Sequence, residues 1–353
     1  MNYMQKKIFD APSTPSKESR EILFQSIANQ DVDDKITPEF FIAHYMHFVA
    51  MTIADGNPSK DTLDTYRKHI DHFLTWCLEK ARVSPFKLKE NHLEFYRNRL
   101  FQKETKGGSH YSKNSISNRI MAIKAFYHAA VKQHIIETNP CDDVKAPRTN
   151  ICDLPFTYYK MDEIKEIVDY VKKDPDEFSC YRNLACIYLM AVSGLRCVEI
   201  HRANREDIDW NNLTMIVHGK GHDGMVYLDD STAGILQEYI DCVDRQPMRV
   251  IKENGKTPLI VSFGPNSSGH RLQRNTIRWN INKILKGVGL KKFGATCHVF
   301  RHSCATALYE NTHDLRVVQD TLRHRNTEVT ARYAHVVEQL EKRPTAILGK
   351  MLK

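Results

Sequence analysis

Six side chains in the second half of the sequence could act together on a phosphate group. In chain order they are Arg196, Lys220, His298, Arg301, His324 and Tyr333. A guanidinium stays charged and binds two phosphate oxygens at once, which favours a displacement that builds negative charge on those oxygens. Lysine and histidine side chains exchange protons, and a phenol, with a pKa of about 10, can attack phosphorus and later leave again. These residue types are compatible with chemistry on a phosphate group, although each of them is weak evidence alone.

Each of these residues also has a simpler interpretation. Arg196 is followed three residues later by Glu199, and such pairs are often weak surface ion pairs. Lys220 lies between two glycines, as an ordinary turn lysine would. His324 and Tyr333 could simply be buried in a core. The prediction therefore depends on the complete ordered set.

A zinc site is the alternative use of the histidine pair in this region. His298 and His302 are four residues apart on a predicted helix, a spacing that can bind zinc. No glutamate follows the first histidine, and Arg301 between the two opposes a dication. We therefore predict no metal site. Adjacent helix residues face different ways, which favours a buried polar position for His302.

The order and spacing of the six residues resemble those of the tyrosine recombinase (phage integrase) family. The resemblance is carried by GLRCVEI, the GKG turn, HVFRH, LRH and TARYAH. It extends over most of the chain, residues 37–345. The sequence departs from the family pattern at Arg323, which stands where the family has glycine in L-G-H, and after Gly221, where a second basic residue is often found.

The resemblance implies a site-specific DNA recombinase that needs no cofactor. In that family the six residues form the catalytic set, and the tyrosine becomes linked to a 3′-phosphate of double-stranded DNA. By this resemblance, Lys220 is expected to be the general acid and His298 to accept the proton of the phenol. His324 is expected to position the phosphate. The sequence itself suggests two supporting residues behind this set: Glu199, one helical turn after Arg196, would orient catalytic side chains, and His302 is next to Arg301. The resemblance further implies that four protomers exchange strands through a Holliday junction, in a tetrameric synapse on double-stranded DNA.

The pattern of apolar residues predicts a mainly α fold. A stripe at spacings of three and four (Leu63, Tyr66, Ile70, Phe73, Cys77) is typical of an amphipathic helix, and a second stripe follows over residues 116–130. With the resemblance, this predicts a helical SAM-like core-binding domain and a mostly helical catalytic domain with a small antiparallel β-sheet. The predicted boundaries are an N-terminal extension (1–36), the core-binding domain (37–145), a linker (146–156), the catalytic domain (157–340) and a C-terminal tail helix (341–353).

Two local signals set the detail of this architecture. Short β-rich runs at residues 213–217 and 225–228 flank the sequence GKGHDG, which predicts a hairpin carrying Lys220 at its turn. Asn139-Pro140 is expected to end the long helix before the linker, because a residue preceding proline avoids the helical conformation.

Composition bounds the class of protein. The 353 residues are 41% hydrophobic and 27% charged, which is typical of globular domains. No apolar run reaches the ~18 residues of a membrane span, and the first residues lack the apolar run of a secretory signal. The nine cysteines form no C-x-x-C pair, so we expect reduced, mostly buried thiols in a cytoplasmic protein that contacts no membrane.

The net charge of +8 is compatible with a polyanionic partner. Residues 37–148 carry an excess of basic over acidic side chains, although a solvated surface would show the same excess. We predict phosphate contacts from Lys103, Lys106 and Lys113 in the first domain and from Arg323 in the second. The two domains would then clamp duplex DNA between them.

Two other functions are compatible with parts of the pattern. A type IB topoisomerase uses the same phosphotyrosyl chemistry to relax DNA, and a DNA-binding regulator could retain the scaffold without catalysis. The complete set of six argues against the regulator, and the integrase-like first domain argues against the topoisomerase. Phage integration, transposon movement and chromosome dimer resolution remain open as the biological role, and the apolar tail could dock on its own domain or on a neighbouring protomer.

Overall fold

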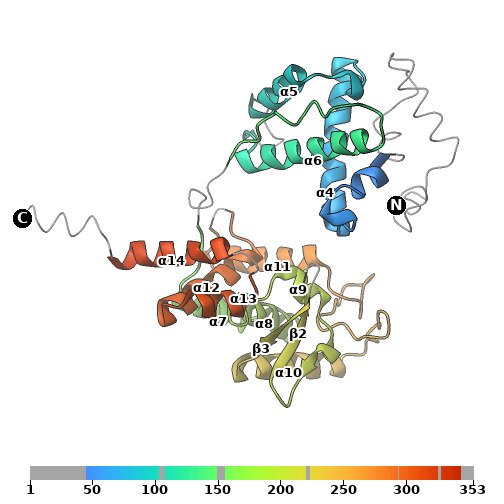
Figure 1. Cartoon of the computed structure of the whole chain (residues 1–353). Coiled ribbons are helices and arrows are strands. Elements are labelled where there is room, and N and C mark those ends of the chain that lie inside the picture. Colours follow the sequence, from blue (N-terminus) through green and yellow to red (C-terminus); the bar gives the residue numbers. More distant parts are fainter. Residues whose placement is uncertain are drawn as a thin grey trace, which may run out of the picture. The chain divides into compact units, whose positions relative to one another are not determined.

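The computed structural model describes residues 45–102, 108–148, 156–219, 223–292, 294–324 and 327–342. The chain divides into two compact units, Met1–Asn150 and Ile151–Lys353 (Figure 1). The sequence-predicted extension at residues 1–36 and the part of the tail beyond residue 342 lie outside the described residues.

Helices build the N-terminal unit. The described part begins within a helix, at residues 45–50. The elements that follow are α4 (Lys60–Thr75), a π-helical turn (Trp76–Ala81), α5 (Glu90–Gln102) and α6 (Lys113–Lys132), with 3₁₀ turns at Ala54–Gly56 and Pro85–Lys87. Serines begin the two long helices: the Ser59 hydroxyl accepts the Thr62 backbone N–H at 3.3 Å, and the Ser112 hydroxyl accepts that of Ser115 at 3.2 Å. Helix α4 packs against α6.

Aromatic rings fill the core of this unit. Phe126 on α6 is fully buried, 4.8 Å from the ring of Tyr45 and stacked on Phe86 at 5.7 Å between ring centres. The buried hydroxyl of Tyr127 donates to the carbonyl of Pro85 at 2.7 Å, so its burial leaves no unpaired polar group. The apolar stripe predicted from the sequence, which includes Ile70 and Phe73, faces this core.

The predicted end of α6 was wrong. The helix ends at Lys132, before Asn139-Pro140, because His134 adopts a left-handed conformation with φ of 55° and turns the chain. The segment after α6 still packs against the N-terminal unit, since Cys141 and Val144 are fully buried in its core.

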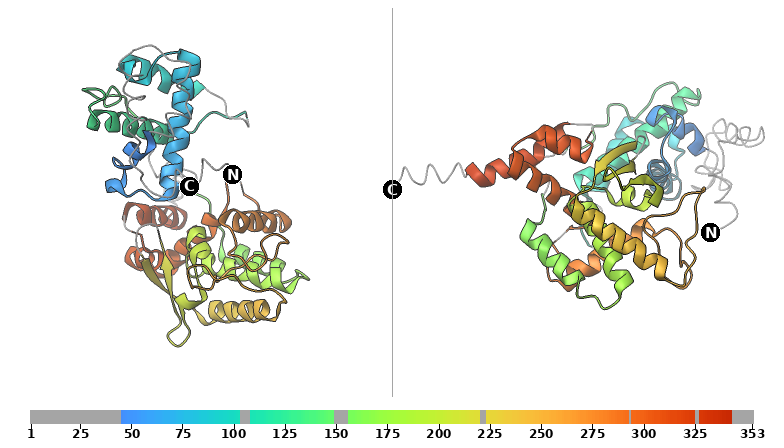
Figure 2. Two further views of the ribbon diagram at one scale, coloured as in Figure 1. Left: turned by 90° about the vertical axis from the view of Figure 1, so that its right-hand side faces the viewer. Right: turned by 90° about the horizontal axis from the view of Figure 1, so that it is seen from below.

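The C-terminal unit combines helices with one small sheet. Its elements are α7 (Met161–Val171), α8 (Glu177–Ala191), α9 (Cys197–Arg202), a 3₁₀ turn (Arg205–Asp207), β1 (Ile208–Asp209), β2 (Thr214–His218), β3 (Asp223–Tyr227), α10 (Asp230–Arg245), α11 (Arg274–Gly287), α12 (Cys297–Thr312), α13 (Leu315–Leu322) and α14 (Thr327–Lys342). The apolar helix α8 packs against α7, α10 and α12. Helices α10 and α14 lie on opposite sides of the unit (Figure 2).

The sheet is antiparallel in the order β1-β2-β3. Met215 and Val217 on β2 and Val226 on β3 point into the core, while Ile216 and Met225 pair across the outer face. The predicted mainly α fold with a small antiparallel sheet, including its hairpin, is thus confirmed.

Eight of the nine cysteines lie within the described residues, and all eight are free and buried, as the scattered spacing predicted. Among the described helices, none combines the length and the apolar composition that crossing a membrane requires.

Helices α12, α13 and α14 enclose a second, smaller core in the C-terminal unit. Cys304 and Ala305 from α12 meet Leu322 at the end of α13, and Tyr333 and Val337 of α14 complete the cluster. This packing holds the tyrosine helix against α12, which also carries Arg301 and His302.

Replacing Phe126 by alanine is expected to destabilise the N-terminal unit by about 3–5 kcal/mol, because the cavity left by a fully buried ring cannot collapse completely. Urea unfolding of the whole chain measures this change. Phe95→Ala is the matched control, since that ring is 61% exposed and its loss should cost about 0.5 kcal/mol or less. Equal effects of the two substitutions would contradict this description of the core.

Candidate active site

A tight turn at the end of α8 positions Arg196. Gly194 has a φ of 65°, a backbone conformation that favours glycine, and a Cβ added there would also displace the Leu322 Cδ2 methyl, which would lie 2.7 Å away. Arg196 then begins α9 as its N-cap residue. The G-L-R segment therefore fixes where this guanidinium enters the site.

The carboxylate of Glu199 anchors Arg196 twice. Glu199 Oε1 accepts from Arg196 Nη1 at 2.8 Å, and Oε2 accepts the backbone N–H of Arg196 at the same distance. The side chain of Glu199 is only 2% exposed, whereas that of Arg196 is 33% exposed. This fixes Arg196 while leaving part of it open to solvent.

Two further guanidiniums surround the same carboxylate. Arg323 Nη2 lies 2.9 Å from Glu199 Oε2, and Arg301 Nη1 lies 3.9 Å from it. Burial alone would raise the pKa of Glu199, but the positive charges of Arg323, Arg196 and Arg301 and the backbone N–H of Arg196 lower it below its ordinary value. Three positive charges around one negative charge leave an excess that favours a bound anion.

Arg301 links the parts of the site. It is 4% exposed, and its guanidinium donates to the carbonyls of Gly194 and Leu322. Burial, with the nearby charge of Arg196, lowers the pKa of Arg301, although an arginine remains charged at neutral pH. The turn before α9 is thereby joined to the end of α13.

The two predicted catalytic histidines both lie near enough to these arginines for Arg301 and Arg196 to affect their pKa values. His298 lies at the surface in the first turn of α12. The protein atoms packed around its imidazole still exclude part of the water, and this desolvation, with the charges of Arg278, Arg301 and Arg196, lowers the pKa of His298. His324, just after α13, places Nδ1 3.1 Å from the Thr330 hydroxyl. Burial, followed by the charge of Arg301, lowers the pKa of His324 to about 4, so this ring is neutral at pH 7.

Tyr333 on α14 lies against this set. Its side chain is 2% exposed, its ring is parallel to that of His324 at 6.3 Å, and its hydroxyl lies 2.9 Å from His302 Nδ1. Burial raises the pKa of the Tyr333 phenol to about 12. The structure therefore brings together five of the six predicted catalytic residues, with Glu199 and His302 in direct contact with members of the set.

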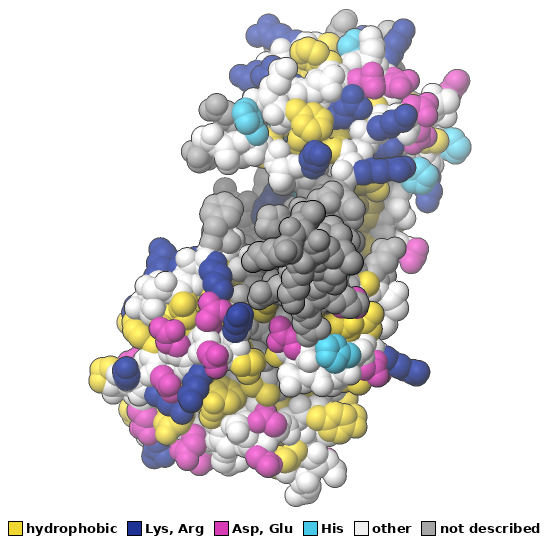
Figure 3. All heavy atoms as spheres, turned by 90° about the vertical axis from the view of Figure 1, so that its left-hand side faces the viewer, with side chains coloured by type: hydrophobic (Ala, Val, Ile, Leu, Met, Phe, Trp, Pro, Cys, Tyr) yellow, Lys and Arg dark blue, Asp and Glu magenta, His cyan; other side chains and the backbone are white. Residues whose placement is uncertain are grey.

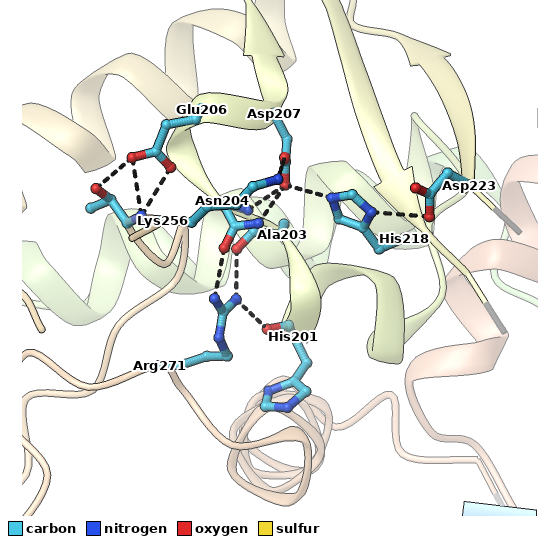
Figure 4. A network of polar contacts seen from close by, with 10 residues as sticks. His201, Ala203, Asn204, Glu206, Asp207, His218, Asp223, Lys256 and Arg271 are labelled. Carbon is cyan, nitrogen blue, oxygen red and sulfur yellow. Dashed lines mark hydrogen bonds and ion pairs between the residues drawn. The ribbon is translucent and has the colours of Figure 1, made fainter. Parts of the chain in front are cut away.

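Lys220, the sixth predicted residue, lies outside the described residues, but both sides of its hairpin are fixed. Arg202 donates to the carbonyl of Gly219 at 2.6 Å, and His218 pairs with Asp223 across the two strands. Figure 4 shows the polar network at this end of the hairpin.

The network is centred on buried Asp207. Its carboxylate accepts the backbone and side-chain N–H groups of Asn204, both at 2.8 Å, and pairs with His218 Nε2 at 3.2 Å. His218 Nδ1 contacts Asp223 Oδ1 at 3.0 Å, so one imidazole bridges two carboxylates (Figure 4). The role of His218 was not predicted from the sequence, because a single histidine at the end of a strand forms no recognisable motif with its neighbours.

Arg323 is not on the regular helix that the sequence suggested. It ends α13 in a left-handed conformation with φ of 55°, which explains why glycine can occupy this position. The side chain of Arg323 is 11% exposed. It passes so close to Gly224 on β3 that a Cβ added to Gly224 would lie 2.7 Å from Arg323 Cδ. The side chain is thus directed toward Glu199.

The predicted DNA contacts of the first unit are only partly described. Lys113 is exposed in the first turn of α6, while Lys103 and Lys106 lie outside the described residues. Basic side chains are spread over the visible face of this unit, with acidic ones among them (Figure 3). Within the described part of the chain, no cluster of three or more histidine, cysteine or acidic side chains could hold a metal ion.

Two family models match the chain. The phage integrase family matches residues 158–339, and the phage integrase SAM-like domain matches residues 41–146. These ranges fall within the C-terminal and the N-terminal unit, respectively.

Tyrosine recombinases and integrases are among the relatives and solved structures similar to this chain. Tyrosine recombinase XerC of Chlamydia caviae is 32% identical over 235 residues, which cover 65% of this chain and 70% of the relative, and that of Leptospira interrogans is 24% identical over 293 residues, or 83% and 88%. The XerH recombinase in a post-cleavage complex with a palindromic difH substrate has a TM-score of 0.68 at 17% identity, covering 98% of this chain and 94% of that one. The Tn1549 transposon integrase in complex with transposon right end DNA has a TM-score of 0.63 at 18% identity, covering 86% and 99%. These two structures share the fold.

Replacing Glu199 by glutamine is expected to lower the free energy of unfolding by about 3–5 kcal/mol, because Arg301 and Arg323 would stay buried without their carboxylate. Glu177→Gln is the control, since Glu177 pairs with Arg245 on the surface, both more than half exposed, and should contribute about 0–1 kcal/mol. Urea unfolding of both variants tests this, and a loss for Glu199→Gln no larger than the control would refute it.

The His218 bridge predicts a pH-dependent contribution to stability. Partial burial lowers the pKa of His218, but the hydrogen bond to Asp223 and the negative charges of Asp207 and Asp223 outweigh it and raise the pKa above its ordinary value. The contribution is therefore complete below a pH of about 6.5 and is lost as the pH rises through the raised value. Thermal unfolding should show that His218→Gln destabilises the protein more at pH 6 than at pH 8.5, and a pH-independent difference would contradict the bridge.

Proposed function

This chain belongs to the phage integrase family of tyrosine recombinases, and we propose that it cuts and rejoins DNA at specific sites through a covalent link to Tyr333. The observation that supports this most directly is that Arg196 and Arg301 converge on Glu199 beside the tyrosine helix. That arrangement offers one phosphate group both fixed positive charge and a nucleophile.

The arginines suit the charge changes of the reaction. Attack on a phosphodiester increases the negative charge on the non-bridging oxygens, and guanidiniums already fixed there favour the transition state over the ground state. Arg196 is held by Glu199 yet partly exposed, so it is proposed to contact the phosphate directly. Arg301 uses two of its donors on carbonyls, which orients its remaining charge toward the same region.

A phenol suits a reversible cleavage. The Tyr333 oxygen forms a bond to phosphorus while the bond to the 5′-oxygen breaks, giving a 3′-phosphotyrosyl link that retains the phosphodiester character. A free 5′-hydroxyl can then attack this link, and the phenol leaves more readily than an aliphatic alcohol because of its lower pKa. Strand rejoining therefore requires no external energy source.

The leaving 5′-oxygen needs a proton, and Lys220 is proposed to supply it. Lys220 follows Gly219, whose carbonyl is held by Arg202, and precedes Asp223, which is held by His218. A lysine is a competent general acid when neighbouring positive charge eases loss of its proton. His298 and His324 are proposed to contact the phosphate.

DNA is proposed to be held by both units, with the chemistry in the second. Lys103, Lys106 and Lys113 of the first unit would contact phosphates, which fix register without reading sequence. Structures similar in fold were solved as complexes of XerH with difH and of the Tn1549 integrase with transposon DNA. A tetrameric synapse in which strands exchange in pairs completes the proposal.

Tyr333→Phe is expected to abolish covalent protein–DNA adducts on nicked suicide substrates, because the phenol oxygen forms the bond to phosphorus. Affinity for the same DNA in a gel-shift assay should stay within about twofold, since the phosphate contacts remain. Denaturing gels measure the adduct. Adducts that persist at the wild-type level in Tyr333→Phe would refute the assignment of the nucleophile.

A further inference from the structure

The hydroxyl of Tyr333 contacts a histidine outside the six-residue set. His302 Nδ1 lies 2.9 Å from the Tyr333 oxygen, a normal hydrogen-bond distance. Among the hydrogen bonds of the described residues, this is the one that the Tyr333 hydroxyl makes. His298, one helical turn earlier on α12, makes no such contact there.

The packing around the two rings holds this pair together. Phe156 meets Tyr333 edge to face at 5.6 Å between ring centres and lies 5.3 Å from His302, while His302 and Tyr333 are 5.8 Å apart. The ring of His324 also lies parallel to the tyrosine ring, at 6.3 Å between ring centres. With Tyr333 almost fully buried, water has little access to its hydroxyl.

The charges around His302 keep its ring neutral. Burial lowers the pKa of His302 to about 4, and His298, Arg332 and Arg301 act in the same direction. These groups, with Tyr333 itself and His324, are the titratable and charged side chains that face the imidazole from α12, α14 and the end of α13. At neutral pH the imidazole thus has one bare nitrogen. We assign Nδ1 as that nitrogen, the tautomer in which the phenol donates its proton to His302.

We propose that His302 accepts the phenol proton of Tyr333 during DNA cleavage and returns it on rejoining. This rests on the proposed role of Tyr333 as the nucleophile, and it assigns to His302 the role that the family resemblance gives to His298. A general base must lie within hydrogen-bond distance of the group whose proton it removes. His302 meets this requirement, since its Nδ1 is 2.9 Å from the Tyr333 oxygen.

The step balances in atoms and charge. The Tyr333 oxygen forms its bond to phosphorus as the O–H bond breaks, and the proton passes to His302 Nδ1, giving an imidazolium. The bond from phosphorus to the 5′-oxygen breaks, and that oxygen takes a proton from the general acid, proposed to be Lys220. Negative charge brought by the DNA phosphate favours the imidazolium, so binding of substrate itself strengthens the base. The reverse sequence rejoins the strand.

The first test compares two matched variants. In His302→Asn, the amide oxygen takes the place of Nδ1 and accepts a hydrogen bond but cannot take a proton, and His298→Asn makes the same change four residues earlier. Single-turnover adduct formation on suicide substrates should slow roughly 100- to 10,000-fold in His302→Asn, and more than in His298→Asn. DNA affinity and the midpoint of thermal unfolding should stay near wild-type values. His302→Asn cleaving within about threefold of wild type would overturn the proposal.

A substrate with sulfur in place of the 5′-oxygen separates the base from the acid. A thiolate leaves without protonation, so this substrate should restore cleavage to Lys220→Ala while leaving His302→Asn slow. Restoration of His302→Asn to the wild-type rate would overturn the proposal, because the lost proton transfer would then belong to the leaving group. Adducts formed by Tyr333→Phe on the same DNA would instead overturn the proposed function, so the two failures are distinguishable.

Chemical rescue covers the case in which His302→Asn does not fold. In His302→Ala, added imidazole should restore adduct formation, and methylimidazoles of higher pKa should restore it further, because proton transfer follows the basicity of the acceptor. A folded His302→Ala variant that cleaves at the wild-type rate without imidazole, or that no imidazole accelerates, would contradict a proton acceptor at this position.

Discussion

One buried carboxylate organises the catalytic unit. Glu199 is nearly inaccessible to solvent and is surrounded by Arg196, Arg301 and Arg323, which come from three different parts of the chain. Burying a guanidinium removes its hydration water, which costs free energy unless hydrogen bonds or ion pairs replace that water. A single carboxylate that bridges several guanidiniums forms an ion pair with each of them. Removing it would leave like charges facing one another where α9, α12 and the end of α13 meet, so Glu199 stabilises the placement that the Arg301 hydrogen bonds and the α12–α14 core also hold.

The same arrangement explains how a cationic site can be rigid and still bind an anion. Backbone carbonyls of Gly194 and Leu322 satisfy Arg301, and Glu199 satisfies Arg196 and Arg323 without cancelling all their charge. The excess positive charge remains directed to the partly exposed side of Arg196. Because the donors are already fixed, little reorganisation is needed when negative charge grows on a substrate.

Local features of this site could be predicted from the sequence, whereas its long-range contacts could not. The three-residue spacing of Arg196 and Glu199 indicates contact on one helix turn, and alternating β-rich runs indicate the hairpin. The contact of His302 with Tyr333 depends on how α12 packs against α14, and no spacing encodes that. The end of α6 was misplaced for a similar reason: His134 adopts a left-handed conformation that a non-glycine residue seldom signals. Arg323 shares this conformation, which hid its direction toward Glu199.

The contact between Arg323 and Gly224 couples the end of α13 to strand β3 of the hairpin, two segments about 100 residues apart in the sequence. The stem of Arg323 runs over the hairpin strand where only a hydrogen atom fits, on its way to Glu199. A hairpin transplanted from a relative with a bulkier residue at position 224 would push the arginine aside and disturb the carboxylate beyond it. Grafts or shuffled chimaeras in this part of the molecule must therefore exchange the end of α13 together with the hairpin, as a matched pair.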